Sequence, residues 1–345
     1  MFIVRSVKTA DLKQVNTLSR MSNAVNLAME TPELRKQIQR SIHSFNGEVS
    51  RPEAEYIFCL EERESQKIIG NSMIIAQHGT KDSPHFYFQV QKLEKFSKTI
   101  HSGIVHEVLK FGYDQDGPTE LGGLILHPAF RHTGQHLGKA LSWVRLMYIA
   151  MHRRRFKDRI LTEFLPPLTE EGKSELWEAI GQKFTNLPYL EADKISRKNK
   201  EFIFSLFPRE HIFTCLLSAR VRQLIGEVGE DSKPATRMLE SIGLKYLRMI
   251  DPFDGGPHYG ARMKDIAVIK ATKRYRIQKS GARKFTQAGL IAKEYDGQFE
   301  AVVGNCKIER KRIQLPSDIK EVLQVGPGDT VHFLPFEIPS QNENI

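Results

Sequence analysis

The chain has 345 residues, of which 40% are apolar and 20 are phenylalanine, so it can bury a large core and, on length, form about two domains. No segment approaches ~20 consecutive apolar residues, and the three cysteines are far apart, which argues against a membrane span, a disulfide framework and a cysteine-based zinc site. The net charge of +10 favours anionic partners, and we expect a cytoplasmic protein that holds no metal.

The first third of the chain predicts a strand, two helices and a strand hairpin. Thr9 is the expected N-cap of the first helix, and Pro32 takes the first helical position of the second. The strands have apolar runs bounded by polar turn residues. In order, these elements are a strand over 2–7, a helix over 9–20, a helix that begins at 31, and strands over 56–61 and 67–77.

The middle of the chain predicts a strand, a glycine-bearing loop and a helix. Leu121–Leu126 is an apolar run, Pro128 follows it before the loop, and the helix is expected from about Gly138 to Phe156. The loop carries Arg131 and Gly134. Because the first backbone N–H groups of a helix lack partners within it, this loop can bind an anion such as a pyrophosphate.

The rest of the chain continues with mixed elements. The expected elements are a strand over 159–165, a helix over 175–184, a strand over 201–207, mostly helix over 213–225, a helix over 234–242 closed by Gly243, and a strand over 244–250. Beyond these, short Val and Ile runs are separated by glycines. We therefore predict one region over 1–275, a small β-rich subdomain over 276–339 and a disordered tail over 340–345.

The positive charge is concentrated in residues 262–284, which hold nine basic residues and one acid, Asp265. Such a concentration of basic residues is typical of a solvated surface and also of a nucleic-acid interface. No aromatic-interleaved binding pattern, zinc-finger spacing or single-stranded-RNA motif accompanies this stretch. Nucleic acid is therefore the second choice as a partner.

The spacing of Pro128, Arg131 and Gly134 after a strand resembles the motif of the GNAT superfamily of acyl-CoA N-acyltransferases. The order of the predicted elements is similar to that of the superfamily. The resemblance implies an α/β (α+β) fold, with a mixed, twisted sheet and flanking helices. It also implies that acyl-CoA is bound by Leu124, Ile125, Leu126, Arg131, Gly134 and Gly138.

Later segments resemble the arginine N-succinyltransferase family. They are Ile225-Gly-Glu-Val228 and Asp251-Pro-Phe-Asp-Gly-Gly-Pro257, together with Glu120-Leu-Gly-Gly-Leu124. The resemblance implies transfer of a succinyl group from succinyl-CoA to the α-amine of arginine, with Leu124 at a position that contacts the donor. Gly229 stands where the family has a histidine proton donor. The chain therefore resembles a divergent member, and either the amine has changed or activity has been lost.

The reaction needs a group that takes a proton from the attacking amine. Glu163 is our first candidate and Glu120 the second, and both could instead be rim carboxylates paired with basic side chains. Asp254 is expected at the acceptor amine or in a turn, and His258 is a candidate replacement for the missing histidine. A non-catalytic acyl-CoA-binding or regulatory protein is the alternative function. The sequence leaves open whether the chain forms homo- or hetero-oligomers.

Overall fold

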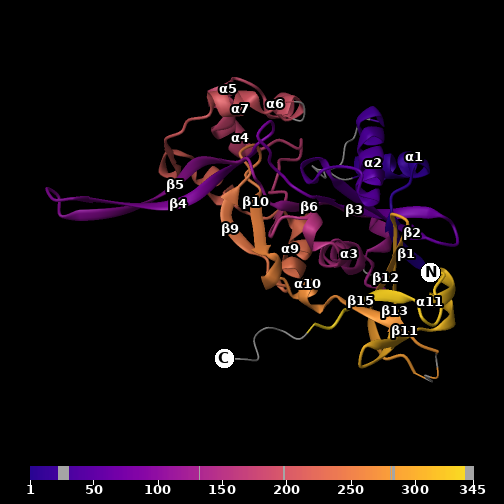
Figure 1. Cartoon of the computed structure of the whole chain (residues 1–345). Coiled ribbons are helices and arrows are strands. Elements are labelled where there is room, and N and C mark those ends of the chain that lie inside the picture. The colour runs from indigo at the N-terminus through magenta and orange to yellow at the C-terminus, as the bar shows by residue number, and fades with distance from the viewer. Residues whose placement is uncertain (22–30, 132, 197–198, 280, 282–283, 339–345) are drawn as a thin grey trace. The chain divides into compact units, whose positions relative to one another are not determined.

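A computed structural model describes residues 1–21, 31–131, 133–196, 199–279, 281 and 284–338 (Figure 1). The chain divides into two compact units, and neither is a continuous segment. Unit 1 comprises residues 1–77, 119–158 and 262–345, and unit 2 comprises residues 78–118 and 159–261. No helix in the described ranges combines the length and apolar character that crossing a membrane requires.

Unit 1 is built on one mixed sheet with the strand order β12-β15-β11-β14-β13-β1-β2-β3-β6. Its strands are β1 (Phe2–Ser6), β2 (Glu55–Glu62), β3 (Lys67–Ile75), β6 (Thr119–Leu126), β11 (Lys273–Ile277), β12 (Gln287–Tyr295), β13 (Gln298–Glu309), β14 (Arg312–Gln314) and β15 (Thr330–Pro335). Its helices are η1 (Thr9–Asp11), α1 (Leu12–Arg20), α2 (Thr31–Asn46), η2 (Arg51–Glu53), η3 (Pro128–Phe130), α3 (Leu137–Met151), η4 (Arg153–Arg155), η7 (Met263–Asp265), α10 (Ala267–Ala271) and α11 (Ser317–Val322).

The predicted strands and helices of the first third are confirmed, with one correction at Thr9. This residue is not an N-cap, because the 3-10 turn η1 already begins there and Lys8 precedes it. The Asp11 carboxylate accepts the Lys8 backbone N–H at 2.7 Å and binds the buried Arg5 guanidinium at 2.7 and 2.9 Å. The first helix is therefore fixed by a buried ion pair.

Helix α3 is buried along nearly its whole length. It ends at Met151, whereas the sequence predicted an end near Phe156. His152 leaves the helical region with φ −126° and ψ 43°, and the basic residues after it form η4. Its inner residues, such as Leu141 and Met147, are fully buried as expected.

Within unit 2 the strands follow the order β7-β10-β9-β4-β5-β8. Its strands are β4 (His85–Ser97), β5 (Ser102–Asp114), β7 (Arg159–Glu163), β8 (His211–Phe213), β9 (Lys245–Ile250) and β10 (Pro257–Arg262, whose last residue belongs to unit 1). Its helices are α4 (Glu175–Ala179), α5 (Gly181–Thr185), α6 (Tyr189–Ser196), α7 (Glu201–Leu206), η5 (Thr214–Leu216), α8 (Ala219–Leu224), η6 (Glu230–Ser232) and α9 (Lys233–Glu240).

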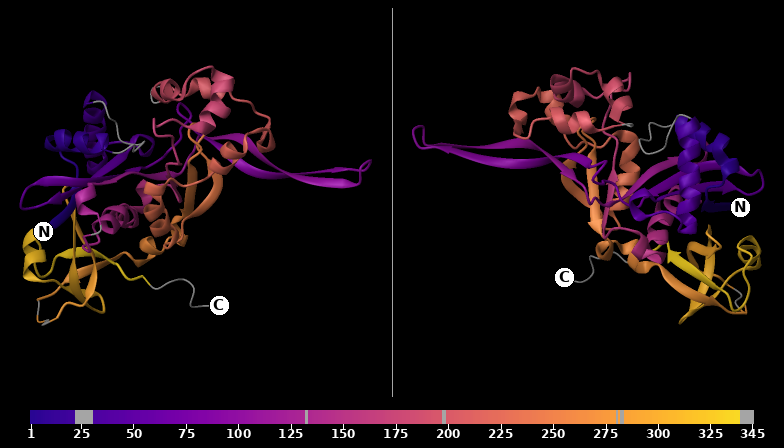
Figure 2. Two further views of the ribbon diagram at one scale, coloured as in Figure 1. Left: turned by 180° about the vertical axis from the view of Figure 1, so that it is seen from behind. Right: turned by 45° about the horizontal axis from the view of Figure 1, so that its top comes forward.

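Strands β4 and β5 form a long antiparallel hairpin that the sequence analysis did not predict. Its pairing runs without interruption from His85 opposite Asp114 to Ser97 opposite Ser102. The base of the hairpin is buried in the core of unit 2, whereas its outer half projects as an arm (Figure 2). Phe96 and Ile104 near the tip are 68% and 54% exposed.

Two predictions for unit 2 are corrected. Residues 201–207 form helix α7 and not a strand, because Ile203 and Phe207, one helical turn apart, are both buried in the core around Trp177. The predicted helix over 175–184 is broken at Ile180 into α4 and α5. The segment over 213–225 is mostly helix, as predicted, with η5 and α8 following the end of β8.

The C-terminal part of the chain is rich in strands, as predicted, and these strands group with the N-terminal ones in unit 1. The domain boundary at residue 275 stays a prediction. The tail over 340–345 lies outside the described residues.

Candidate active site

Two histidines of unit 2 are directed at one carboxylate oxygen. Glu163 is the last residue of β7, and His258 lies at the start of the neighbouring β10, where the Phe164 N–H donates to the Pro257 carbonyl at 3.1 Å. His85 is the first residue of β4. Glu163 Oε1 lies 3.1 Å from His85 Nε2 and 3.4 Å from His258 Nε2. His85 and His258 are 3% and 0% exposed.

The rings of three histidines are packed together beside Glu163. His85 stacks on His258 with a centroid distance of 5.1 Å, and His78 meets the His85 ring edge-on at 4.5 Å. The nearest ligand atoms of His78, His85 and Glu163 all lie within 4.8 Å of one another. The same holds for Glu163, Asp251 and His258.

The turn before His258 is held by its own aspartates. Asp251 Oδ1 accepts the N–H groups of Phe253 at 2.6 Å and Asp254 at 3.2 Å, and Asp254 Oδ1 accepts the Gly256 N–H at 2.7 Å. Gly255 has φ +85°, a conformation that favours glycine. The turn chemistry anticipated for Asp254 is therefore present, and ligand atoms of Asp251, Glu163 and His258 lie within 4.8 Å of one another.

The cluster concentrates negative charge on Glu163. Burial opposes ionisation of this carboxyl, but the neighbouring His258 and the hydrogen bond from His85 hold its pKa well below the usual range. Burial and the charge of Glu163 raise the pKa of Asp251 to about 7, and burial together with Asp251 raises that of Asp254 well above its usual value. Burial lowers the pKa of His258 to about 3, although the charge of Glu163 acts in the opposite direction.

In unit 1, strand β6 contains a bulge of two glycines. The register of β3 against β6 shifts between Asn71 and Met73, and Gly123 has φ +55°. Asn71 Nδ2 donates to the Gly123 carbonyl at 2.6 Å, and the buried Arg145 donates to the Gly122 carbonyl at 3.1 Å. These contacts fix the backbone immediately before Leu124.

The predicted acyl-CoA residues lie in order along β6 and the loop to α3. Leu124 and Leu126 are partly exposed, while Ile125 between them is 4% exposed. The Arg131 Nε donates to the Leu126 carbonyl at 3.1 Å. Gly134 has φ +75° and open space around it, with no heavy atom within 4 Å of where a Cβ would lie.

The loop ends at an uncapped helix start. His136 adopts a left-handed conformation with φ 56°, and no side chain caps the first turn of α3. Gly138 lies in that turn, where an added Cβ would make only an ordinary contact with Leu126 at 3.7 Å. The first-turn backbone N–H groups are therefore a suitable place for a pyrophosphate.

The structure brings together some of the predicted site residues and separates others. Glu163, Asp254 and His258 belong to the cluster in unit 2, whereas Glu120 lies on β6 in unit 1, fully buried and opposite Ile75. The sequence analysis missed His78, His85 and Asp251. Asp251 opens a motif that was recognised, but no local pattern marked the two histidines.

Gly229 occupies a position without room for a side chain. Its N–H donates to the Leu165 carbonyl at 2.8 Å, so this segment packs against the chain that follows Glu163. A Cβ at Gly229 would lie 2.9 Å from the Pro166 carbonyl oxygen and 3.0 Å from that of Leu165. A histidine there would require the backbone to shift.

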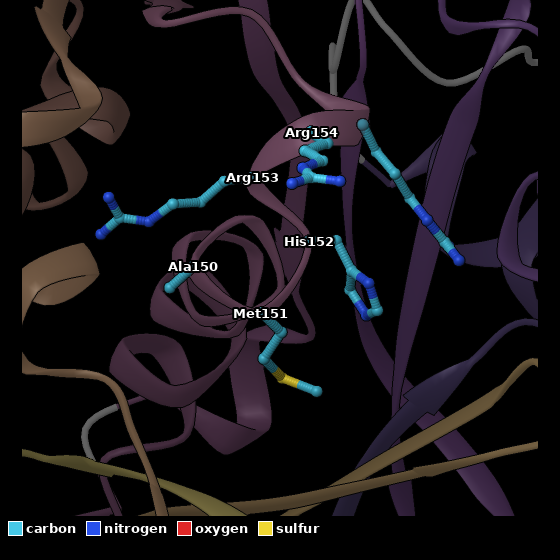
Figure 3. A pocket seen from close by; sticks show the side chains of 6 residues that line it. Ala150, Met151, His152, Arg153 and Arg154 are labelled. Atoms are coloured by element: carbon cyan, nitrogen blue, oxygen red, sulfur yellow. The ribbon is translucent and has the colours of Figure 1, made fainter.

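A surface cavity of about 410 Å³ lies at the C-terminal end of α3, away from the Gly134 loop, and is lined by residues 150–155. Figure 3 shows the Arg153 and His152 side chains pointing in different directions. His152 Nε2 lies 2.6 Å from the Glu294 carboxylate. Because the basic groups do not converge, this cavity is a weaker candidate for an anion site than the start of α3.

Comparison with known proteins identifies relatives that span the chain. A family described as "Arginine N-succinyltransferase beta subunit" matches residues 2–268. Arginine N-succinyltransferase of Yersinia pestis (strain Pestoides F) is 30% identical, covering 98% of this chain and 99% of its own. The enzyme of the same name from Photorhabdus laumondii is also 30% identical, covering 99% and 100%. The solved structure of arginine/ornithine succinyltransferase subunit AI from Pseudomonas aeruginosa aligns with a TM-score of 0.85 and 27% identity, covering 97% and 98%. The GNAT-like fold is thereby confirmed.

Proposed function

Because the chain belongs to the arginine N-succinyltransferase beta-subunit family, and is thus an acyltransferase that uses an acyl-CoA, we propose that it transfers a succinyl group from succinyl-CoA to the α-amine of arginine or a related amino acid. The names of its relatives support this choice of donor and acceptor. A cytoplasmic location fits a reaction between a coenzyme A ester and a free amino acid. The transfer is direct and needs no metal.

The donor binds along β6 and the following loop. Its pyrophosphate is held by backbone N–H groups from the Gly134 loop to the Gly138 turn, with Arg131 beside them. The thioester carbonyl lies at the Leu124 main chain, where the glycine bulge fixes the backbone. A backbone N–H directed at the developing oxyanion is typically worth about 10²–10³ in rate.

The acceptor site is the cluster around Glu163. The amine nitrogen attacks the thioester carbon, a C–N bond forms, the C–S bond breaks, and the thiolate of coenzyme A leaves. The amine proton passes to the imidazole of His85, which Glu163 holds in position through the 3.1 Å contact between Nε2 and Oε1. This partly buried contact is the observation that carries the assignment. Glu120 stays the second candidate for the carboxylate.

Substitution of Glu163 tests the assignment. Glu163→Gln keeps the shape of the side chain but removes its charge, so kcat for succinyl transfer to arginine should fall by about 10²–10⁴ while the Kd for succinyl-CoA changes little. Release of the coenzyme A thiol gives the rate, and calorimetry gives the affinity. The exposed Glu171→Gln of the same unit is the matched control.

Full activity of Glu163→Gln would overturn the role of Glu163. Equal or faster turnover of acetyl-CoA would contradict succinyl-CoA as the donor. Turnover with another amine in a panel, but not with arginine, would identify a different acceptor. Binding of succinyl-CoA without turnover of any amine would favour the non-catalytic alternative.

A further inference from the structure

The outer half of the β4–β5 hairpin, residues 91–107, has little support from the rest of unit 2. Strand β4 pairs with β9 only at Phe88 and Gln89, and β5 pairs with β8 only over residues 108–110. Beyond these contacts, the described residues supply no further strand on either side of the arm (Figure 2). A two-stranded hairpin alone is only marginally stable in water, so further strands are needed to stabilise it.

Apolar side chains of the arm face the solvent. Phe96, Ile100, Ile104 and Val105 are between 54% and 69% exposed. A group of exposed apolar side chains on a projecting element is typical of a surface that a protein partner covers. The open edge of β4 indicates which partner this is.

The edge of β4 that faces away from β5 is open beyond Val90. Arg248 of β9 donates from its Nε to the Val90 carbonyl at 3.2 Å, so this carbonyl points to the β9 side of the strand. Because backbone groups alternate along a strand, the N–H and C=O groups of Lys92 and Glu94 point to the same side. No strand among the described residues pairs with them there.

We propose that this edge pairs with the same edge of a second copy of the chain, antiparallel and with Leu93 on the two-fold axis. Each copy then has Lys92 opposite Glu94 of the other, so two hydrogen-bonded pairs of opposite charge flank the axis. Pairing centred on residue 94 or 95 would instead set two glutamates or two lysines opposite each other. The two hairpins form a four-stranded sheet, and Phe96 of each copy packs beside the base of the other arm.

The charge of the arm favours a second copy over an anionic partner. Lys92, Lys95 and Lys98 are opposed by Glu94 and Glu107, so most of the net charge of +10 lies outside the arm. Two basic chains can therefore approach each other through their arms with little repulsion. Charged residues on an edge strand hinder pairing with most other strands, so the order of Lys92 and Glu94 selects a strand of complementary order.

Sedimentation of the full-length protein tests the dimer. At about 100 μM, a concentration suited to a small interface, the wild type should sediment with twice the mass of one chain. Glu94→Lys and Lys92→Glu should each weaken association at least about tenfold, because two cross-strand pairs change from attraction to repulsion. The double variant restores opposite charges and should restore the dimer. The exposed Glu171→Lys, which makes the same charge change elsewhere in unit 2, is the matched control.

A cysteine on the axis tests the register. In a Cys215→Ser background, which removes the exposed cysteine, Leu93→Cys should form a disulfide between two copies, because the two Cα atoms would lie about 4.5 Å apart. Ser102→Cys, on the other strand of the hairpin, is the control and should not cross-link. A monomeric wild type, a dimer that the single charge variants leave intact, or a double variant that stays monomeric overturns the proposal. Equal cross-linking at residues 93 and 102 overturns it as well.

Discussion

The family resemblance puts a histidine at position 229. In this chain the residue is Gly229, and the backbone carbonyl groups of Leu165 and Pro166 fill the space that a side chain there would need. The residue is fixed by its hydrogen bond to the Leu165 carbonyl, and the adjoining Pro166 carbonyl closes the remaining space. The imidazoles near Glu163 come instead from His85 and His258, on two other strands. The proposed acceptor site therefore uses histidines that lie outside the Gly229 segment.

A methyl group at Gly229 should be enough to reveal this close packing. Gly229→Ala places a Cβ 2.9 Å from a backbone oxygen that cannot rotate away, so the free energy of unfolding should fall by about 1–3 kcal/mol. Urea unfolding followed by circular dichroism measures the loss. Gly138→Ala is the matched control, because its Cβ would make an ordinary 3.7 Å contact within a helix. Equal stability of the two variants would contradict the packing.

The residues of the candidate site were only partly predictable. Asp254 lies in a segment that resembles the family, and His258 directly follows that segment. Glu163 lies in a predicted strand, so all three could be named from the sequence. His85 lies far from Glu163 in the sequence, and the two are brought together by strand pairing within unit 2. Neither histidine at 78 or 85 has a local pattern that marks it, because its role depends on a tertiary contact.

Among the elements, prediction failed where tertiary packing overrides local preference. Residues 201–207 are a short run rich in bulky apolar side chains, which favours a strand. The core of unit 2 nevertheless accepts Ile203 and Phe207 from one helix face and leaves Phe204 39% exposed. The hairpin arm was missed because its outer strands mix apolar and charged residues. The strands with continuous apolar runs, such as β2 and β3, were predicted well.

Strand β15 carries a histidine whose environment links stability to pH. Burial, with the positive charge of Arg274 and His152 outweighing the opposing Glu294, lowers the pKa of His332 to about 4. The ordinary pKa of an unfolded histidine is about 6.5, so the unfolded chain binds more protons between these values. The stability due to neutral His332 is therefore present above pH 6.5 and is lost as the pH falls towards 4.

Lowering the pH from 7 to 5 should thus destabilise the wild type more than His332→Gln. The difference in unfolding free energy should be about 1 kcal/mol, a reduced figure because His332 is partly exposed to solvent. Urea titrations of both proteins at the two pH values measure it. Parallel losses in the two proteins would show that His332 does not contribute.

At the scale of the whole molecule, the charge of +10 acts on every anionic ligand. Coenzyme A esters carry several negative charges, whereas arginine carries a small net charge. A basic protein attracts the former over distances of about 10 Å at 0.1 M salt. The part of the basic segment described as β11 is folded into the sheet of unit 1, which makes it a fixed source of this field.

Salt should therefore weaken the binding of the acyl-CoA donor more than the binding of the amine acceptor. Between 0.05 and 0.5 M sodium chloride, the KM for the acyl-CoA should rise several-fold, while the KM for arginine changes less than about twofold. Initial rates of thiol release at each salt concentration provide both values, with potassium acetate as a control for the anion. A larger salt effect on the KM for arginine would contradict the view that the positive charge of the protein acts mainly on the acyl-CoA.

The order in which the chain is synthesised is at odds with the order of the sheet in unit 1. The chain passes between the units four times. Strand β1 pairs with β13, so Ile3 can pair with Val302 only after nearly the whole chain has been synthesised. At about 5–20 residues per second, one edge of the first strand stays open on the ribosome for roughly 15–60 s. Strands β2 and β3 are made early, but the sheet is complete only when translation is nearly finished. The yield of folded protein should therefore depend on how well a cell protects a growing chain.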